Sequence, residues 1–572
     1  MGSGLAVAAL LTAVALSAQQ NDDVLLRAMK DELKRSNRLT EQKFAPPYYI
    51  EYRAEDTVSH GISASLGALT ESVDSASRVP LVHVRVGDYN TDNTNHRFSE
   101  AYNGSRFDPD RLPLDDNYMA FRNVFWLATD RAYKTAEDAL ARKRSSLKNM
   151  SQPEALPDFS KASPSQLILP VERKPFALDA WKKEIVQVSA VFGAYPQVLS
   201  SGVELQVSQS TNYVLNSEGT VLRIPEDLSY IRVAARALAA DGASVHDEHL
   251  FEAFEADRLP GEEELTRASR EVAEHVIALS QAPKGEAYDG PVLIEAPAAA
   301  QLFGQLLGDN LKLTRKPIAD LGWVSPLPSS ELEKRVGSRI LPEWMDVVDD
   351  STQTKFGDHL LLGHYLYDVE GIAPQPVTLV EKGVLKTFLL TRTPMFKDFP
   401  GSNGHARFTG VFGDAAPGFG NLFIRASQTT PATVMKQKLI DMCKERGKPY
   451  GILIRKLQFP SAATDGRPVD EPLLVYRVYP DGREEMVRSL QFHGVSTRSF
   501  KDIVAASDEN YVLDLIDINA RGNFITTASV IAPAVLFEEL ELTPVEQETP
   551  QPPIVPAPAL SAQPVASAAS AR

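Results

Sequence analysis

The chain of 572 residues carries 59 Lys and Arg against 75 Asp and Glu, which gives a formal net charge of −16. At about 150 residues per domain, this length predicts roughly two to four domains. A hydrophobic content of 43% with 23% charged residues excludes bulk disorder. The acidic balance, with no run of five basic residues, argues against nucleic acid as a partner.

The first 18 residues resemble a targeting segment. Leu5–Ala18 is an apolar run that ends in small residues, which suits a signal peptide and is too short to span a bilayer. The four residues before it contain no Lys or Arg, unlike an ordinary signal. We therefore predict a signal peptide at 1–18 and an exported, periplasmic or secreted mature chain without a membrane span. A cytoplasmic chain is the alternative.

Helical and strand patterns then follow in blocks. Helical spacing of apolar residues predicts helices at 22–39, 135–150, 178–192 and 261–280. Alternation predicts strands at 48–88, 203–207, 213–215, 221–224 and 231–233, with a hairpin turn at Asn216–Gly219. This order, without regular βαβ units, favours an α+β fold with mixed, mostly antiparallel sheets flanked by helices.

Two structured domains and a tail are expected. Pro283–Gly285 closes the last helix of the first half, so we place an N-terminal α+β domain at 22–285 and a strand-rich C-terminal domain at 286–542. Residues 543–572 are rich in Pro and Ala without periodicity, which predicts disorder.

Few residues offer chemistry on their own. Cys443 is the sole cysteine, so there is no intramolecular disulfide and no cysteine-based zinc cluster. His359 and His364 are five residues apart, which places them on opposite faces of a strand or about 140° apart on a helix. They are kept as an alternative metal pair. His405 and Arg407 lie in a glycine-rich loop, a common setting for site residues.

Several segments together resemble the TldD/PmbA family, the peptidase family once called modulators of DNA gyrase. They span about residues 200–540 in the family's order. The matching segments are Asn216–Thr220, Tyr288–Glu295 with Ala298–Ala300, Tyr367–Gly371, Val377–Lys386, Ser402–Arg407 and Asn421–Ile424.

The resemblance implies an α+β protein of two domains and zinc-dependent peptide cleavage as the family activity. The family works as a pair of a zinc-bearing TldD subunit and a zinc-less PmbA (TldE) subunit. In the zinc-bearing subunit, a HExxxH helix follows the "AA" segment and a later cysteine supplies the third ligand.

This chain departs from the zinc-bearing pattern. The positions expected to be His, Glu and His hold Phe303, Gly304 and Gly308, and no cysteine follows Cys443. The resemblance is therefore to the zinc-less side, and no cofactor is expected in this chain; zinc is expected only in a catalytic partner.

Three hypotheses follow from the sequence. The first is a non-catalytic, peptide-positioning subunit that pairs with a zinc-bearing TldD-like subunit or with itself and holds extended peptides. The second is an exported peptide-binding or structural protein without a proteolytic role. The third is a hydrolase with a relocated site, for which His359, His364, His405, Asp368 and Glu370 are candidates; Arg407 is a further candidate at the retained segments.

Overall fold

The computed structural model describes residues 23–39, 46–97, 106–107, 111–148, 156–319, 329–399, 401–408, 415–458, 469–517 and 525–545. The predicted signal peptide and residues 546–572 lie outside this range. Among the described residues, no helix is both long enough and apolar enough to cross a membrane.

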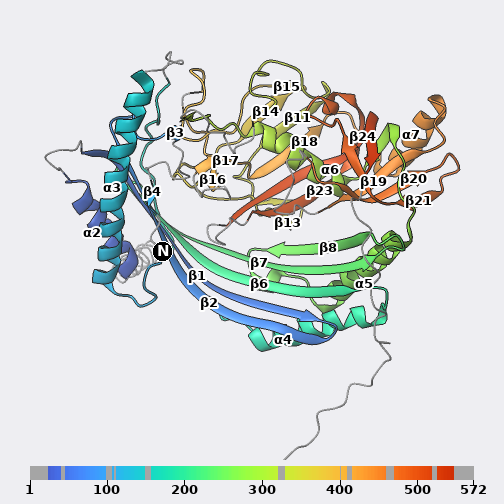
Figure 1. Ribbon diagram of the computed structural model, residues 1–572, viewed down its shortest axis with the longest axis horizontal. Helices are drawn as coiled ribbons and strands as arrows, with labels where there is room; N and C mark the ends of the chain where they lie inside the picture. The colour runs from blue at the N-terminus through green and yellow to red at the C-terminus, as the bar shows by residue number, and fades with distance from the viewer. Residues whose placement is uncertain are drawn as a thin grey trace, which may run out of the picture.

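An antiparallel sheet of long strands dominates the first half (Figure 1). Within the described residues it has seven strands in the order β4-β2-β1-β6-β7-β5, with β8 also paired to β7. The strands are β1 (Pro47–Ser65), β2 (Ala68–Val86), β4 (Arg106–Phe107), β5 (Gln166–Ile168), β6 (Ser200–Asn216), β7 (Val221–Leu238) and β8 (Ser244–Ala253).

Two hairpin turns fix the register of this sheet. Leu66 and Gly67 join β1 to β2 with φ of 49° and 79°, the paired positive φ of a type I′ turn. The segment Asn216–Thr220 joins β6 to β7, and the Asn216 side chain accepts hydrogen bonds from the backbone N–H groups of Glu218 and Thr220 (both 3.1 Å). The predicted hairpin is confirmed here.

Helices cover the two ends of this sheet. At one end, α2 (Val24–Ser36) and α3 (Tyr118–Lys148) pack on β1, β2 and β6. At the other end, α4 (Leu178–Ser189) and α5 (Glu262–Gln281) bury a second cluster against β6, β7 and β8. Figure 1 shows α2 and α3 on the left, and α4 and α5 at the other end of the strands. Helix α3 begins 17 residues before the predicted 135–150 helix.

The second half forms a mixed sheet with its own core. Within the described residues it has eleven strands, ordered β15-β14-β11-β18-β24-β9-β19-β20-β21, with β22 and β23 also paired to β24. These strands are β9 (Tyr288–Ile294), β11 (Met345–Asp349), β14 (Val377–Glu381), β15 (Val384–Leu385), β18 (Asn421–Ala426), β19 (Gly451–Leu457), β20 (Pro472–Val478), β21 (Glu484–Val487), β22 (Leu490–His493), β23 (Ile503–Asp517) and β24 (Thr526–Pro544).

Helices α6 (Ala296–Leu302) and α7 (Ala432–Glu445) pack on this sheet, and Cys443 is buried on α7 as a small apolar residue. Strand β24 continues to Pro544, so the ordered region runs slightly past the predicted start of the tail at 543. The remaining short elements are β3 (His96–Arg97), β10 (Ile318–Ala319), β12 (Lys355–Phe356), β13 (His359–Leu360), β16 (Ala406–Phe408), β17 (Ala415–Pro417), and the single turns η1 (Ala190–Ala194), η2 (Ala256–Arg258), η3 (Phe303–Gly308), η4 (Asp309–Leu311) and η5 (Ser499–Asp502).

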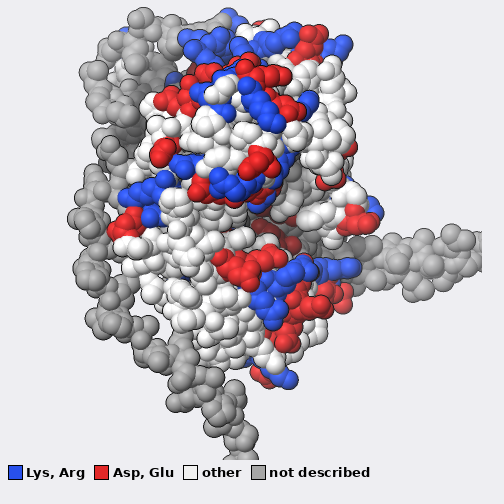
Figure 2. All heavy atoms as spheres, turned by 90° about the vertical axis from the view of Figure 1, so that its right-hand side faces the viewer, with Lys and Arg blue, Asp and Glu red and all other residues white. Residues whose placement is uncertain are grey.

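The expected α+β class with mixed and antiparallel sheets is confirmed. The C-terminal half lies above β8 in Figure 1, and side chains of β19 and β20 contact the first half. Leu473 and Leu474 of β20 join the apolar cluster of the first half, and Lys456 of β19 pairs with buried Asp247 of β8 (2.5 Å). Figure 2 shows the face on the right-hand side of Figure 1, where Lys and Arg are interspersed with Asp and Glu.

Candidate functional site

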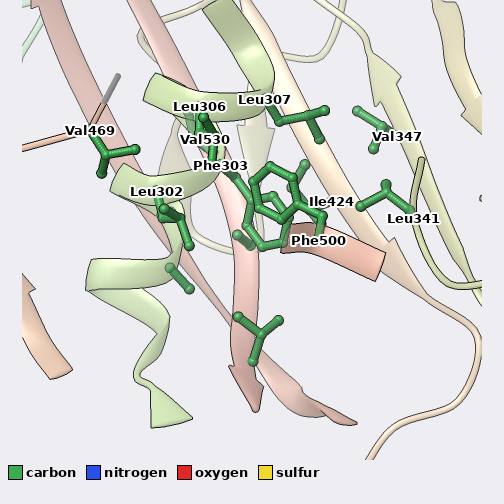
Figure 3. Packing of buried hydrophobic residues seen from close by; sticks show 14 of the residues in the cluster. Leu302, Phe303, Leu306, Leu307, Leu341, Val347, Ile424, Val469, Phe500 and Val530 are labelled. Carbon is green, nitrogen blue, oxygen red and sulfur yellow. The ribbon is translucent and has the colours of Figure 1, made fainter. Parts of the chain in front are cut away.

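The helix that follows the "AA" segment is packed with apolar side chains (Figure 3). Helix α6 runs into η3, a turn of wider π-type winding. Phe303 is fully buried, and its ring stacks on that of Phe500 with centroids 5.0 Å apart. The three positions expected to hold His, Glu and His thus lie inside the main core of the second half.

These positions do not fit a zinc ion. A Cβ atom added at Gly304 would lie 3.3 Å from Val530 Cγ2, and one at Gly308 would lie 2.7 Å from Phe419 Cε1. An imidazole at either position would have to displace these apolar side chains, and Phe303 has no ligand atom. Among the described residues, no group of three or more His, Cys, Asp and Glu side chains is arranged to hold a metal.

Asp368 and Glu370 are buried and hydrogen-bonded to the backbone. The Asp368 carboxylate accepts hydrogen bonds from the N–H groups of Glu370 (2.9 Å), Ile372 (2.8 Å) and Ala406 (3.1 Å). Glu370 accepts one from the N–H of Arg392 (2.7 Å). Burial raises the pKa of both carboxyl groups. Both side chains hold neighbouring loops together.

His405 is wholly buried rather than displayed on its glycine-rich loop. Its Nε2 lies 2.9 Å from Asp349 Oδ1, and its Nδ1 lies 2.9 Å from the carbonyl oxygen of Asn403. Asp349 also accepts hydrogen bonds from Ser351 Oγ and the N–H of Gly420. The imidazole therefore ties the loop to β11.

His359 and His364 have separate partners. His359 Nε2 lies 2.6 Å from Asp514 Oδ2 on β23, and the hydrogen bond to this carboxylate raises the pKa of His359. The Nδ1 of His364 lies 2.9 Å from the carbonyl oxygen of Ser351. The structure gives these two histidines no shared partner.

Arg407 lines a cavity, as do His364 and Asp368. A cavity of about 420 Å³, hereafter the interdomain cavity, lies between strands β1, β6 and β7 of the first half and the second-half segments 364–369, 406–408 and 525–527. Arg407 Nη2 donates to the carbonyl oxygen of Thr527 (2.8 Å), and the guanidinium lies over the Tyr365 ring, 4.3 Å from its centroid.

The residues on the sheet side of this cavity did not stand out in the sequence. They alternate along β6 and β7, so one face of the sheet supplies them. Glu226 of β7 is one of the charged residues on this side, and its Oε2 accepts a hydrogen bond from Asn212 Nδ2 (2.6 Å). Glu226 is open to the cavity yet surrounded by protein, and this burial raises its pKa. The polar residues at every second position of β6 were the available signal.

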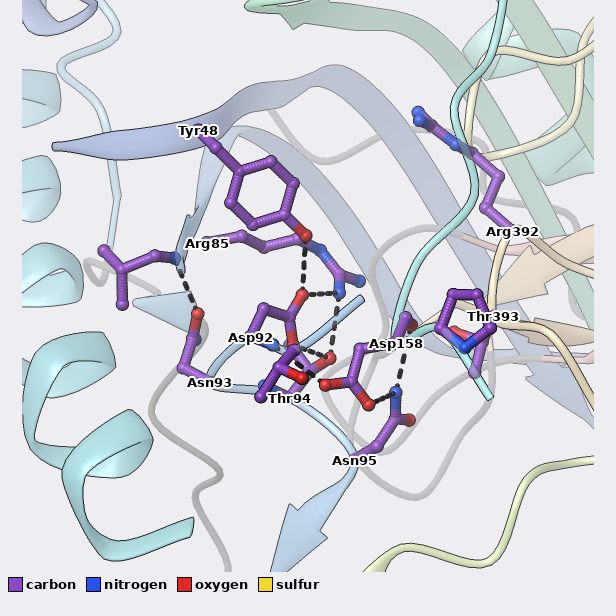
Figure 4. A network of polar contacts seen from close by, with 12 residues as sticks. Tyr48, Arg85, Asp92, Asn93, Thr94, Asn95, Asp158, Arg392 and Thr393 are labelled. Carbon is purple, nitrogen blue, oxygen red and sulfur yellow. Dashed lines mark hydrogen bonds and ion pairs between the residues drawn. The ribbon is translucent and has the colours of Figure 1, made fainter. Parts of the chain in front are cut away.

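A polar network of the first half lies close to Arg392 of the second half (Figure 4). Arg392 of the second half donates to the Ser160 carbonyl oxygen and to Glu218 Oε1 (both 2.7 Å). Its guanidinium also lies over the Phe159 ring (4.0 Å). The same ring is covered by Arg85 (3.7 Å), so the 156–160 segment is clamped between the halves.

The anchoring continues within the first half. Arg85 Nη1 and Tyr48 Oη both donate to Asp92 Oδ2, at 2.8 and 2.7 Å. Asp158 accepts hydrogen bonds from Asp92 N (2.8 Å) and from Asn95 Nδ2 (3.1 Å). The contact between the halves at the 156–160 segment is thus made by hydrogen-bonded, buried groups rather than by exposed ion pairs.

Comparison with known proteins gives a consistent result. Residues 288–544 match the family model described as the PmbA/TldA metallopeptidase C-terminal domain. A metalloprotease of Methanothermobacter thermautotrophicus is 28% identical over 235 residues, which cover 40% of this chain and 47% of that protein. The chain therefore aligns with about half the length of this relative.

Solved structures extend the likeness to nearly the whole fold. TldE from Thermococcus kodakarensis superposes with a TM-score of 0.56 at 15% identity, covering 90% of this chain and 100% of that one. A protein described as a modulator of a DNA gyrase from Thermotoga maritima gives 0.54 at 15% identity, covering 86% and 96%. The resemblance noted in the sequence is confirmed: residues 288–544 match the C-terminal domain of the PmbA/TldA metallopeptidase family, and most of the chain shares the fold of these solved structures.

Proposed function

We propose that this chain is a peptide-positioning subunit of a peptidase assembly and has no zinc site on its α6–η3 helix. It pairs with a zinc-bearing TldD-like subunit or with a second copy of itself. The observation that carries the proposal is the apolar filling of that helix, where Phe303 stacks on Phe500 and Phe419 occupies the space beside Gly308.

A subunit without a metal can still form half of a substrate chamber. Strand β8 supports this role, because it is an edge strand within the described residues and lies on the side where the halves meet. An extended peptide can add to such an edge through main-chain hydrogen bonds, with little dependence on its sequence. Extended or unfolded peptides are therefore the proposed substrate class.

The test compares the chain alone with the chain co-expressed with a HExxxH-bearing TldD-type relative. We expect the chain alone to contain no stoichiometric zinc by mass spectrometry and to leave casein and short peptides intact. The co-expressed pair should co-purify, contain about one zinc per pair and cleave peptides in a chelator-sensitive manner. A partner with both zinc-binding histidines replaced by Ala is the matched control and should co-purify without cleaving.

Two other outcomes would overturn the proposal in different directions. Near-stoichiometric zinc with chelator-sensitive cleavage by the chain alone would indicate a relocated metal site, with His359 and His364 as the first positions to substitute. Peptide binding without any partner or cleavage would indicate a binding protein without a proteolytic role.

Export is part of the proposal. A signal peptide at 1–18 predicts that the mature protein begins just after Ala18 and is found in the periplasmic or secreted fraction. Intact mass and N-terminal sequence of the native protein from each cell fraction decide the matter. A full-length chain in the cytoplasm would remove export and leave the subunit role in place.

A further inference from the structure

The interdomain cavity presents one acidic side chain whose charge is poorly matched by the protein around it. Glu226 on β7 faces the cavity, and its hydrogen-bond partner is the neutral amide of Asn212 (2.6 Å). The positive charge that acts on the Glu226 carboxylate is that of Arg407. The Arg407 guanidinium already donates to the Thr527 carbonyl oxygen and lies over the Tyr365 ring. The raised pKa of Glu226 agrees with this shortage of positive charge.

The other charges of the lining do not correct the shortage. Among the described residues of the lining, Glu55, Asp227, Glu255 and Asp368 add acidic groups, whereas Arg53 and Arg407 are the arginines. Glu255 is bound to Lys174 at 2.5 Å, on the exposed surface. Arg53 is bound to Glu51 Oε1 at 2.6 Å. The cavity therefore carries an excess of carboxylates, which favours a ligand with a positive charge.

The two arginines of the cavity wall also have buried hydrogen-bond donors without acceptors. Arg53 is 2% exposed, and its Nη1 is buried with no hydrogen-bond partner among the described residues. The Nε of Arg407 is in the same condition. A buried donor without an acceptor is destabilising, so a ligand oxygen that moves within reach of either guanidinium would be stabilised.

The remainder of the wall is apolar and of limited size. Leu222, Ile224 and Leu228 of β7, with Phe254 and Phe408, line the cavity. The volume of about 420 Å³ lies within the range of sites for small ligands. A ligand that fits must combine a cation, a nearby carbonyl or carboxylate oxygen and a small apolar side chain.

We propose that the interdomain cavity binds the amino terminus of a peptide, with the α-ammonium group at Glu226 and the following carbonyl oxygens at the guanidinium groups of Arg407 and Arg53. This inference rests on the proposed function and adds to it an anchor for one end of the substrate. A free amino acid carries the same two groups, so it is the second source that the experiment must separate.

The experiment is isothermal titration of the purified full chain with Ala-Leu-Ala, its N-acetylated form and free leucine. We expect Ala-Leu-Ala to bind, and acetylation to weaken binding about tenfold or more, because the charge that pairs with Glu226 is lost. Glu226→Gln should weaken Ala-Leu-Ala to the level of the acetylated peptide without weakening the acetylated peptide further. This non-additivity ties the ammonium group to Glu226.

The substitution is chosen to spare the fold, because the Gln carbonyl can still accept the Asn212 hydrogen bond. Glu263→Gln, at an exposed position in the first turn of α5, is the matched control and should leave all three titrations unchanged. Equal unfolding midpoints for both variants confirm that the comparison is fair.

Three results would overturn the inference: equal affinity for the acetylated peptide, no effect of Glu226→Gln, or no binding of Ala-Leu-Ala at millimolar concentration. Leucine binding as tightly as Ala-Leu-Ala would identify a free amino acid as the ligand instead. Co-purification with the zinc-bearing partner and cleavage by the pair are measured separately. Their failure would remove the proposed function, whereas failed titrations with an active pair would remove only the amino-terminal anchor.

Discussion

The α6–η3 helix and the interdomain cavity are two candidate sites in this molecule, and they differ in what fills them. The α6–η3 helix carries Phe303, Gly304 and Gly308, and aromatic rings occupy the space around it. The interdomain cavity keeps about 420 Å³ of space and keeps buried arginine and glutamate side chains at its wall. The comparison teaches that a site without ligand residues is filled by the core, whereas a space lined by charged groups stays open.

The largest expected effect tests how fully the helix has joined the core. Phe303→Ala removes a fully buried ring that stacks on Phe500, and such truncations cost about 3–5 kcal/mol. The free energy of unfolding from urea titration measures the loss. Phe356→Ala, at a ring that is 37% exposed, is the control and should cost far less. Equal losses would mean that the helix is not part of the core.

The next effect tests the clamp beside the open cavity. Arg392→Met leaves Glu218 and the Ser160 carbonyl oxygen without their buried partner, which should cost about 3 kcal/mol. Limited proteolysis should also cut the 156–160 segment faster. Arg339→Met removes an exposed ion pair with Glu343 and should change stability by less than about 1 kcal/mol. A clamp variant as resistant as the wild type would contradict this account.

A smaller effect tests whether the space beside the α6–η3 helix is full, by adding a single methyl group there. Gly→Ala inside a helix usually stabilises by about 0.5–1 kcal/mol. At Gly308 the new Cβ would lie 2.7 Å from Phe419, so Gly308→Ala should instead destabilise by about 1–3 kcal/mol. Gly193 has nothing within 4 Å of the corresponding position, and Gly193→Ala serves as the control in the same thermal melts. A stabilising Gly308→Ala would show that space remains beside the helix.

The smallest effect is a change in pH dependence where the halves meet. Burial, together with the Asp514 carboxylate, raises the pKa of Glu252 on β8 from 4.5 to about 8. The native state then binds more protons than the unfolded state between these values, so stability falls as the pH rises from about 4.5 to 8. His359 is paired with Asp514, and Tyr511 lies in the same charge environment.

Glu252→Gln should remove this part of the fall and raise the unfolding midpoint at pH 8 relative to that at pH 5. Melting curves of both proteins across this pH range provide the measurement. The same dependence in the two proteins would assign it to another group.

Much of the fold could be predicted from local pattern. Strands β6 and β7 were evident because strict alternation surrounds the Asn216–Gly219 turn, and α5 was evident from its acidic first turn and apolar stripe. The first half of α3 was missed because exposed Met119 and Trp126 blur the stripe formed by Phe121 and Phe125. This part of α3 is stabilised by packing against β1 and β2, which are distant in sequence.

The candidate site was less accessible to prediction. The glycines around His405 suggest an exposed loop residue, but its ring is buried and lies 2.9 Å from the carboxylate of Asp349, 56 positions earlier. Arg407 was named from the same loop and does line a cavity. Glu226 and Arg53 were not named, because their importance comes from two halves of the chain meeting over one face of a sheet. No local pattern records that meeting.

The position of β24 has a consequence for how the protein forms. This strand, Thr526–Pro544, lies between β18 and β9 and also pairs with β22 and β23. Its partner β9 begins at Tyr288, so during synthesis the ribosome completes every other strand of the second sheet before the one that joins them. Long-range pairing of this kind slows folding and leaves strand edges exposed while the chain waits. We therefore expect the strands on either side of β24 to join into one sheet only after this last strand has been made.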